Sequence, residues 1–188
     1  SGKMGFALAA ECHARGAEVL LVSGPVSLPA PAGVTLQKVT SAADMYDACM
    51  KAFPATDISI LSAAVADYRV EQPAQEKIKK KEEALSLQLT KTTDILQALG
   101  RQKQPNQILV GFALETQDAR TYALGKLEAK NADVMVMNNL RDAGAGFGHD
   151  TNKITIFDRR GTELNFEVKS KSLVAADIIN HLYSFMHA

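Results

Sequence analysis

Lysine side chains gather at two places in the sequence where they could bind a polyanion. Lys126 and Lys130 lie four residues apart within a predicted helix, so both side chains project from one face of it. Lys77 belongs to a charged stretch, residues 71–84, that also contains Lys79, Lys80 and Lys81. Two ammonium groups on one helix face can share a chain of phosphates, although a solvated helix face is the more common cause of this spacing. Because residues 71–84 follow a predicted strand-end loop, we expect them to form a mobile flap.

A second set of candidate residues follows a predicted buried strand. The segment that begins at Ser62 reads SAAVADY. Its small residues, Ala63 and Ala64 among them, would let a ligand approach the backbone, and Asp67 could accept hydrogen bonds from a hydroxyl or an amide group. A tight turn in which Asp67 acts as an N-cap accounts for the same residues equally well.

Several common motifs are absent or incomplete. Gly144, Gly146 and Gly148 have the spacing G-x-G-x-G, and a predicted hairpin follows them where a dinucleotide-binding fingerprint would open a helix. The four histidines have no metal-binding spacing relative to one another or to the two cysteines. Cys12 and His13 are adjacent on a predicted helix, where neighbouring side chains do not face each other, so packing explains them better than nucleophilic catalysis does.

These residues are positioned by an alternation of apolar runs and helical patterns. Apolar runs predict strands at 18–23, 35–39, 57–62, 107–114 and 133–138, and an alternating run predicts another at 85–90. Helical spacing predicts helices at 3–15, 41–53, 93–102, 118–132 and 170–186, with Ser1, Ser41 and Ser170 or Ser172 as N-caps. Residues 152–158 and 163–169 are predicted to form a hairpin around the turn RRGT.

Buried strands separated by helices indicate an α/β fold. We predict a doubly wound, mostly parallel Rossmann-like sheet with helices on both faces, followed by a C-terminal β-hairpin and helix. Strands such as 18–23 should be buried on both faces. In a sheet of this kind ligands bind outside the carboxyl ends of the strands, so the loop after residue 62 is the first place to expect a site.

Composition limits the possible functions. The 188 residues fit a single domain, 1–188, and 21 basic residues balance 21 acidic ones, which argues against general nucleic-acid binding. The two cysteines cannot form a disulfide framework, so the expected compartment is a reducing cytoplasm. No apolar run approaches the length needed to cross a membrane.

An ordered set of motifs points to a known family. In chain order they are SGKMG, SGPVSLP, AAVADYR, EKIKKK, KTTDI, VGFALET and AGFGHDTN. Together they resemble the bacterial phosphopantothenoylcysteine synthetase family, the ligase half of the bifunctional coenzyme A biosynthesis flavoprotein. The resemblance spans essentially the whole sequence.

The resemblance implies a two-step ligation in coenzyme A biosynthesis. CTP would convert the carboxylate of 4′-phosphopantothenate into an acyl-cytidylate with loss of pyrophosphate, and the amine of cysteine would then displace CMP. Cationic groups and Mg²⁺ would stabilise the developing charge, and no covalent nucleophile would be needed. The resemblance also implies a homodimer, and fusion to, or pairing with, a flavin-dependent decarboxylase. We expect no FMN in this chain itself.

The same resemblance assigns roles to individual residues. Lys77 resembles the catalytic lysine of the family's mobile flap. The expected nucleotide-binding residues are Ser62, Ala63, Ala64, Asp67, Thr93, Asp94, Ile95, Leu96, Phe112, Lys126 and Lys130. Ala63 and Ala64 are also expected to contact the acyl substrate.

The sequence departs from the family pattern in two places. Family members commonly have K-N-P-D-I where this chain has Lys91-Thr92-Thr93-Asp94-Ile95, within the segment expected to read the base. They also begin with a strand, a glycine-rich turn and an asparagine before SGKMG. Because that strand would lie in the middle of the sheet, we expect an open position there.

Two other functions remain compatible with the sequence pattern. A Rossmann sheet would also suit an NAD(P)-dependent oxidoreductase, because one fold hosts many functions. A non-enzymatic dimerising or regulatory module is the third possibility, with Ile154, Ile156 and Phe166 of the predicted hairpin as its contact surface.

Overall fold

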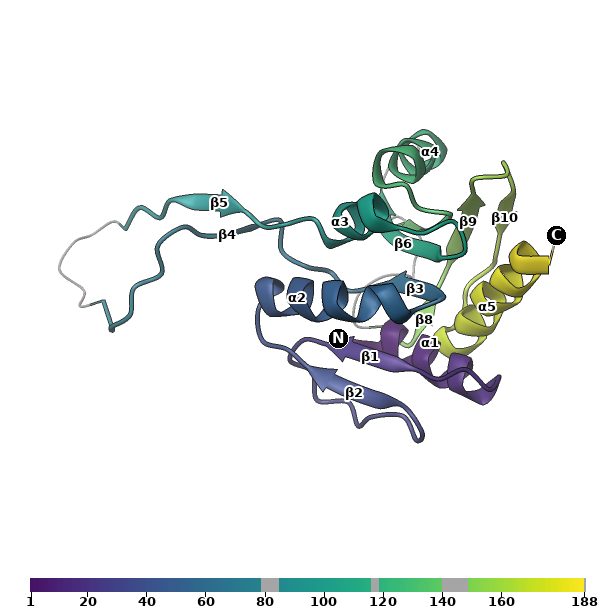
Figure 1. Cartoon of the computed structure of the whole chain (residues 1–188), viewed down its shortest axis with the longest axis horizontal. Coiled ribbons are helices and arrows are strands. Elements are labelled where there is room, and N and C mark those ends of the chain that lie inside the picture. Colours follow the sequence, from purple (N-terminus) through teal and green to yellow (C-terminus); the bar gives the residue numbers. More distant parts are fainter. Residues whose placement is uncertain (79–84, 116–118, 140–148, 188) are drawn as a thin grey trace.

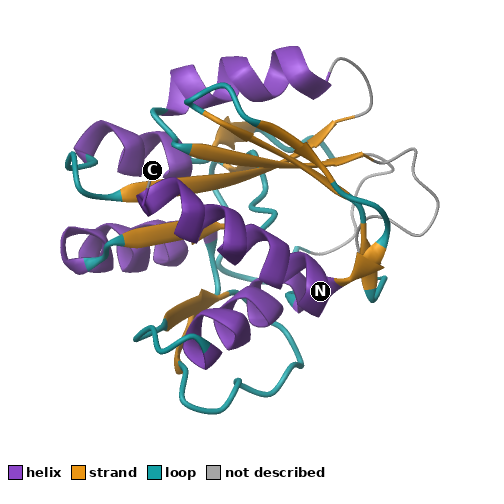
Figure 2. Ribbon diagram, turned by 90° about the vertical axis from the view of Figure 1, so that its right-hand side faces the viewer, coloured by secondary structure: helices purple, strands orange, loops and turns teal. Residues whose placement is uncertain are grey.

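The structure is a computed structural model that describes residues 1–78, 85–115, 119–139 and 149–187. Its centre is a five-stranded sheet in the order β10-β9-β7-β6-β3 (Figures 1 and 2). Strands β3 (Ile58–Leu61), β6 (Ile108–Glu115) and β7 (Val134–Asn139) are parallel, and β9 (Ile154–Asp158) and β10 (Glu163–Asn165) continue the sheet as an antiparallel hairpin.

Helices cover both faces of this sheet (Figure 2). Helices α1 (Lys3–Ala14) and α5 (Lys171–His187) pack on one face, and α2 (Ala42–Ala52), α3 (Ile95–Gln102) and α4 (Ala119–Lys130) pack on the other. The short 3-10 helix η1 (Phe53–Ala55) follows α2. The predicted doubly wound α/β fold, with its C-terminal hairpin and helix, is confirmed.

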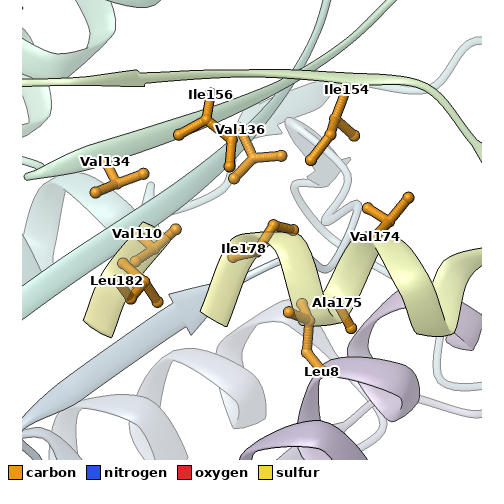
Figure 3. Packing of buried hydrophobic residues seen from close by; sticks show 10 residues of the cluster. All are labelled: Leu8, Val110, Val134, Val136, Ile154, Ile156, Val174, Ala175, Ile178 and Leu182. Atoms are coloured by element: carbon orange, nitrogen blue, oxygen red, sulfur yellow. The ribbon is translucent and has the colours of Figure 1, made fainter. Parts of the chain in front are cut away.

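The largest core cluster lies between the sheet and α5 (Figure 3). Alternate residues of the strands, such as Val134 and Val136, point toward Ile178 and its neighbours on the helix. Ile154 and Ile156 of the hairpin belong to this cluster and are almost completely buried. The predicted contact surface on the hairpin is therefore wrong, because these side chains fill the core of the same chain.

Strands β1 (Leu20–Ser23) and β2 (Thr35–Lys38) form a separate parallel pair. Within the described residues, no hydrogen-bonded ladder joins β1 to β3. The prediction that β1 is buried on both faces is wrong, since only Ser23 in it is buried. Among the described residues β1 pairs only with β2, and the side chains from Leu20 to Val22 stay exposed or partly exposed to water. The open position expected from the family resemblance stays a prediction.

A two-stranded ribbon projects from the body of the molecule (Figure 1). It consists of β4 (Tyr68–Val70) and β5 (Leu89–Lys91), which are antiparallel with Val70 opposite Leu89. We call the described residues 68–78 and 85–91 the arm. The strand predicted at 85–90 is thus shorter and later than expected. A second small pair, β8 (Thr151–Asn152) with β11 (Lys169–Ser170), ties the start of the hairpin to the start of α5.

The helix ends follow the predicted caps with one exception. Ser41 and Asp44 form a capping box at α2, with the Asp44 N–H donating to the Ser41 hydroxyl at 3.1 Å. The Ser170 hydroxyl accepts from the Leu173 N–H at 3.3 Å at the start of α5. At α1 the N-cap is Gly2 and not Ser1, because the chain enters this helix through a left-handed conformation with φ of 72°.

Candidate active site

The loop after β3 lies against the first turn of α1. Ser62 is half-buried, and Ala63 and Ala64 are exposed. A Cβ atom added to Gly5 would lie 3.1 Å from the Ser62 hydroxyl oxygen, so a glycine there lets the helix pass close to the strand end. The sequence interpretation did not single out Gly5, although a glycine in the first turn of a predicted helix was an available signal.

Phe112 stands at the same level of the sheet as Ser62. Leu61, the last residue of β3, pairs with Gly111 of β6, so Ser62 lies level with Phe112, although β6 itself continues to Glu115. The Phe112 side chain is partly buried and packs against the core cluster beneath α1 and α5. The structure thus brings Phe112 of β6 near the loop at Ser62 that follows the neighbouring strand β3.

The predicted pair, Lys126 and Lys130, lies next to Asp94 in the segment that is expected to bind the nucleotide base. The Lys130 ammonium lies 2.7 Å from the Asp94 carboxylate. Burial raises the pKa of Asp94, but the hydrogen bonds from Lys130 and from the Gln97 N–H, together with the positive charges of Lys130 and Lys126, hold it below its usual value. Lys126 and Lys130 therefore both place positive charge near the Asp94 carboxylate, and we call these three residues the cluster of Asp94, Lys126 and Lys130.

This cluster depends on a close contact between α3 and α4. A Cβ atom on Gly100 would lie 1.8 Å from the backbone carbonyl oxygen of Lys130, a distance that only a glycine permits. The Asn131 side chain donates to the Gly100 carbonyl at 2.8 Å, and Asn131 itself has a positive φ of 49°. Gly100 and Asn131 therefore fix the end of α4 where Lys130 can reach Asp94.

The remaining residues of the base-reading segment divide into two kinds. Thr93 is exposed beside Asp94. Ile95 is buried, and Leu96 packs into the core near Gly111. The side chains of Ile95 and Leu96 therefore hold α3 on the sheet, and only their backbone could face a ligand.

The predicted nucleotide-binding residues lie on two sides of the sheet. Phe112 packs on the side of α1 and α5, whereas Asp94, Lys126 and Lys130 belong to α3 and α4 on the opposite side. A single ligand that contacts both groups has to cross the carboxyl edge of the sheet.

Asp67 and Lys77 belong to the arm and its base. Asp67 is exposed just before β4, and its backbone carbonyl accepts from the Thr92 N–H at 2.9 Å. The Thr92 hydroxyl donates to the Ala66 carbonyl at 2.5 Å, which fixes the base of the arm. Lys77 is exposed on the arm, which points away from the body (Figure 1). Lys79, Lys80 and Lys81 lie outside the described residues.

Buried charges at the opposite, amino edge of the sheet were not predicted. Asp133 precedes β7 and accepts two hydrogen bonds from Lys103, at 2.7 and 2.8 Å, and one from the Leu109 N–H at 2.8 Å. The Lys103 and Asp133 side chains are only 6% and 7% exposed.

A second buried pair lies at the same edge. His181 Nε2 is 3.2 Å from the Asp158 carboxylate. Burial lowers the pKa of His181 more than the charge and hydrogen bond of Asp158 raise it, with Arg160 adding to the lowering.

Other predicted features can be stated only for the described ranges. There, no group of three or more His, Cys, Asp or Glu residues is placed to hold a metal ion. Across the same part of the chain, no helix combines the length and apolar character needed to span a membrane. Gly144, Gly146 and Gly148 fall outside the described residues.

Comparison with known families gives a match over nearly the whole chain. Residues 1–186 match the family described as DNA/pantothenate metabolism flavoprotein C-terminal domain. The chain belongs to this family. The resemblance inferred from the ordered motifs is thereby confirmed.

Members of the family with assigned names are similar along the full chain. A protein named cysteine/cysteine sulfinic acid decarboxylase, from an unidentified prokaryote, is 48% identical over 188 residues, which cover 100% of this chain and 52% of that protein. The Coenzyme A biosynthesis bifunctional protein CoaBC of Bacillus subtilis is 46% identical over 183 residues, or 97% of this chain and 45% of that protein. The chain thus spans about half the length of the curated relatives it matches.

A solved member of the family has the same fold. The crystal structure of the C-terminal domain of a CoaBC protein superimposes with a TM-score of 0.84 at 35% identity, covering 100% of this chain and 84% of that one. The central, mostly parallel sheet with its helices is therefore the fold of that domain.

Proposed function

We propose that this chain is the ligase domain that joins 4′-phosphopantothenate to cysteine in the cytoplasm, in coenzyme A biosynthesis, with CTP as the activating nucleotide. The observation that carries the proposal is the cluster of Asp94, Lys126 and Lys130, found in a chain of this family. Lys126 and Lys130 bring two ammonium groups to one part of α4, and ammonium groups donate strong hydrogen bonds to phosphate oxygens.

The proposed reaction has two steps. An oxygen of the substrate carboxylate attacks the α-phosphorus of CTP, the bond to the β-phosphate breaks, and pyrophosphate leaves. The nitrogen of cysteine then attacks the acyl carbon, loses a proton, and CMP departs with the electrons of the broken C–O bond. Both steps develop negative charge on phosphate oxygens, and in this proposal Lys126 and Lys130 donate hydrogen bonds to such oxygens.

Small groups at the carboxyl edge would hold the acyl part. The exposed backbone at Ala63 and Ala64 lets a substrate approach β3, and Asp67 offers a carboxylate for a hydroxyl or amide of the acyl chain. Mg²⁺ binds through one or two carboxylates and substrate phosphates, so an exposed Asp67 fits a metal brought in with the nucleotide. When bound, Mg²⁺ would neutralise charge on the phosphates. The proposal places FMN in the decarboxylase half of the bifunctional relatives and not in this chain.

Coupled product release tests the proposed function. Pyrophosphate should appear from CTP only when 4′-phosphopantothenate is present, and CMP only after cysteine is added. ATP, GTP and UTP serve as parallel arms for base selectivity. No pyrophosphate with any of the four nucleotides would refute the proposal, and saturable binding of NADH or NADPH would favour the oxidoreductase instead.

Lys77 has a separable role in this proposal. Lys77→Ala should lower kcat and leave the CTP concentration for half-maximal rate nearly unchanged, because an exposed arm residue contributes little to resting nucleotide binding. Rapid-quench measurement of the first turnover gives the comparison. If the first turnover of Lys77→Ala is as fast as that of the wild-type protein, the catalytic assignment is contradicted.

We also propose that the chain forms a homodimer through the arm. Tyr68, Ile78, Leu85, Leu87 and Leu89 are large apolar side chains on the arm that are 53% to 66% exposed. Leu89 opens β5, and Leu85 and Leu87 lie in the segment just before it. A two-stranded ribbon is only marginally stable alone, and pairing with the same ribbon of a second copy would bury these side chains symmetrically.

Sedimentation of two matched variants tests the dimer. Leu87→Ser combined with Leu89→Ser should convert a dimer into a monomer. Leu173→Ser is the control, because Leu173 is 57% exposed on α5 and lies off the arm. A dimer that survives the double change, or a wild-type monomer, would exclude this interface.

A further inference from the structure

A small cavity lies at the amino edge of the sheet, between helix α4 and the turn that joins β9 to β10. Its volume is about 230 Å³, below the ~300 to 1,000 Å³ of pockets that take drug-sized ligands. The cavity is lined by three apolar residues and three charged ones, namely Leu124, Leu127, Ala132, Glu128, Asp158 and Arg159. A ligand of this cavity therefore has to be small, and it can combine an apolar part with charged parts.

One part of the cavity is aliphatic. Leu127 and Ala132 are buried, whereas Leu124 is 41% exposed. Leu124 and Leu127 lie three positions apart on α4, so their side chains are neighbours on one side of the helix. An apolar group in the cavity would remove part of the Leu124 side chain from water, which is favourable.

Two opposite charges line the cavity without pairing with each other. Glu128 is exposed and the Arg159 side chain is 43% exposed, yet among the described residues no ion pair joins the two. The Nη2 atom of Arg159 donates to the Asn131 side chain at 3.0 Å and to the Ala132 carbonyl at 3.1 Å. Its Nη1 atom has no hydrogen-bond partner in the described ranges. Nη1 can therefore donate to a ligand carboxylate, and Glu128 can accept from a ligand ammonium group.

Asp158, the third charged residue of the lining, is already engaged by the hairpin turn. One of its carboxylate oxygens accepts from the N–H groups of Arg160 and Thr162, at 2.9 and 3.0 Å. The other oxygen lies 3.2 Å from His181 Nε2, and Asp158 as a whole is only 2% exposed. The charge pattern that a ligand meets is therefore set by Glu128 and Arg159.

The cavity adjoins the contacts that fix the end of α4. The Asn131 side chain accepts from Arg159 and donates to the Gly100 carbonyl. Lys130, the residue before Asn131, belongs to the lysine pair of the candidate active site. A ligand that joins Glu128 on α4 to Arg159 on the hairpin would therefore hold the part of the helix that carries Lys130.

We propose that this cavity is a regulatory site for a free α-amino acid with an apolar side chain. The carboxylate of the ligand accepts from Arg159, its ammonium group donates to Glu128, and its side chain lies against Leu124. A zwitterion matches both charges of the cavity, whereas a phosphate or a simple carboxylate would be repelled by Glu128. Binding joins α4 to the hairpin and preorganises Lys130 for the nucleotide, an effect that rests on the proposed function.

Calorimetric titration of the whole chain with L-leucine, L-methionine and L-valine tests the site. At least one of the three should bind saturably at a single site per chain. For leucine, 4-methylpentanoate lacks the ammonium group and 3-methylbutylamine lacks the carboxylate, so each should bind at least about tenfold more weakly. Glycine, which lacks the apolar side chain, should also bind more weakly. No saturable binding of any of the three amino acids, or equal binding of leucine and its two analogues, would overturn the proposal.

Two variants locate the amino acid in this cavity. Glu128→Gln should weaken amino-acid binding about tenfold and leave binding of 4-methylpentanoate unchanged, because only the contact with the ammonium group is lost. Arg159→Gln should weaken both ligands, but it also removes the contact with Asp133, so its folding has to be compared by urea unfolding. Glu18→Gln, an exposed position just before β1, is the charge-matched control. Unchanged amino-acid affinity in Glu128→Gln would refute the site.

The coupling to the nucleotide is measured with the amino acid at saturation. The half-saturating CTP concentration should fall about fivefold, and CTP should tighten amino-acid binding by the same factor, because coupling between two sites is reciprocal. Asn131→Gly keeps the left-handed backbone at this position and removes both side-chain hydrogen bonds, so the amino acid should still bind but without this coupling.

The outcomes separate this inference from the proposed function. If the amino acid binds but leaves CTP dependence unchanged, the regulatory role is refuted and the ligase proposal stands. If amino-acid binding depends on Glu128 as predicted but no pyrophosphate is released from any nucleotide, the amino-acid site stands and the ligase proposal fails.

Discussion

The two edges of the central sheet carry charged residues in different ways. At the amino edge, Asp133 is buried and accepts hydrogen bonds from Lys103 and from the backbone. At the carboxyl edge and on the arm, Asp67, Lys77 and Asp150 are exposed. A buried charge has to be paired to be tolerated, whereas an exposed one can exchange water for a ligand. The difference fits a structural role for the buried charges at the amino edge and the proposed ligand binding at the carboxyl edge and the arm.

Asp133→Asn should give the largest effect on stability. It leaves Lys103 buried without its counter-charge, which we expect to lower the free energy of unfolding by about 3 to 5 kcal/mol. Asp94→Asn is the matched control, because its partner Lys130 is partly exposed and asparagine is also a good N-cap; its loss should stay below about 1 kcal/mol. Urea unfolding of both variants gives the comparison. Equal losses of unfolding free energy in Asp133→Asn and Asp94→Asn would contradict the difference between the buried and the exposed ion pair.

Gly100→Ala should affect both stability and nucleotide binding. The new Cβ atom would collide with the Lys130 carbonyl, so the end of α4 has to move, at a cost of about 1 to 3 kcal/mol. Lys130 would move with it, and the half-saturating concentration of CTP should rise. Gly125→Ala, at a position with open space around it, should instead gain up to about 1 kcal/mol from helix propensity. If Gly100→Ala leaves the free energy of unfolding unchanged, the close contact between Gly100 and Lys130 is contradicted.

His181 should make stability depend on pH. Its folded pKa lies below the unfolded value of about 6.5, so the unfolded chain takes up a proton first as the pH falls. The contribution of His181 is therefore fully present above the unfolded pKa and is lost as the pH drops from there toward the folded pKa. Thermal unfolding of His181→Phe should show a flatter pH dependence in this window, while His187→Gln, at the exposed end of α5, should not.

The sequence was sufficient for the fold because the core strands are continuous apolar runs. The runs at 107–114 and 133–138 correspond to β6 and β7, and Ser41 capped α2 as expected. Patterns of this kind involve residues that are close in the sequence, so they can be recognised without knowledge of the fold. The short β4 was missed because its pairing with β5 joins residues about 20 positions apart and its side chains are mostly exposed.

The candidate site was only partly predictable for the same reason. Spacing on one helix correctly placed Lys126 and Lys130 together, but nothing local connects them with Asp94, which lies 36 residues before Lys130. The role of Gly100 was not predicted, because only the folded structure brings it against the Lys130 carbonyl. The Asp133 cluster was missed because Lys103 is 30 residues away in the sequence. The expected catalytic role of Lys77 stays a prediction.

The central claim is that the Lys126 and Lys130 cluster binds the nucleotide and does not hold the fold. Pyrophosphate release and urea unfolding, measured together on Lys130→Ala and Lys126→Ala, test it most directly. We predict that the half-saturating CTP concentration rises about tenfold in each variant, equivalent to about 1.4 kcal/mol, while the free energy of unfolding changes by less than about 1 kcal/mol. Unchanged CTP dependence together with a large loss of stability would contradict the account.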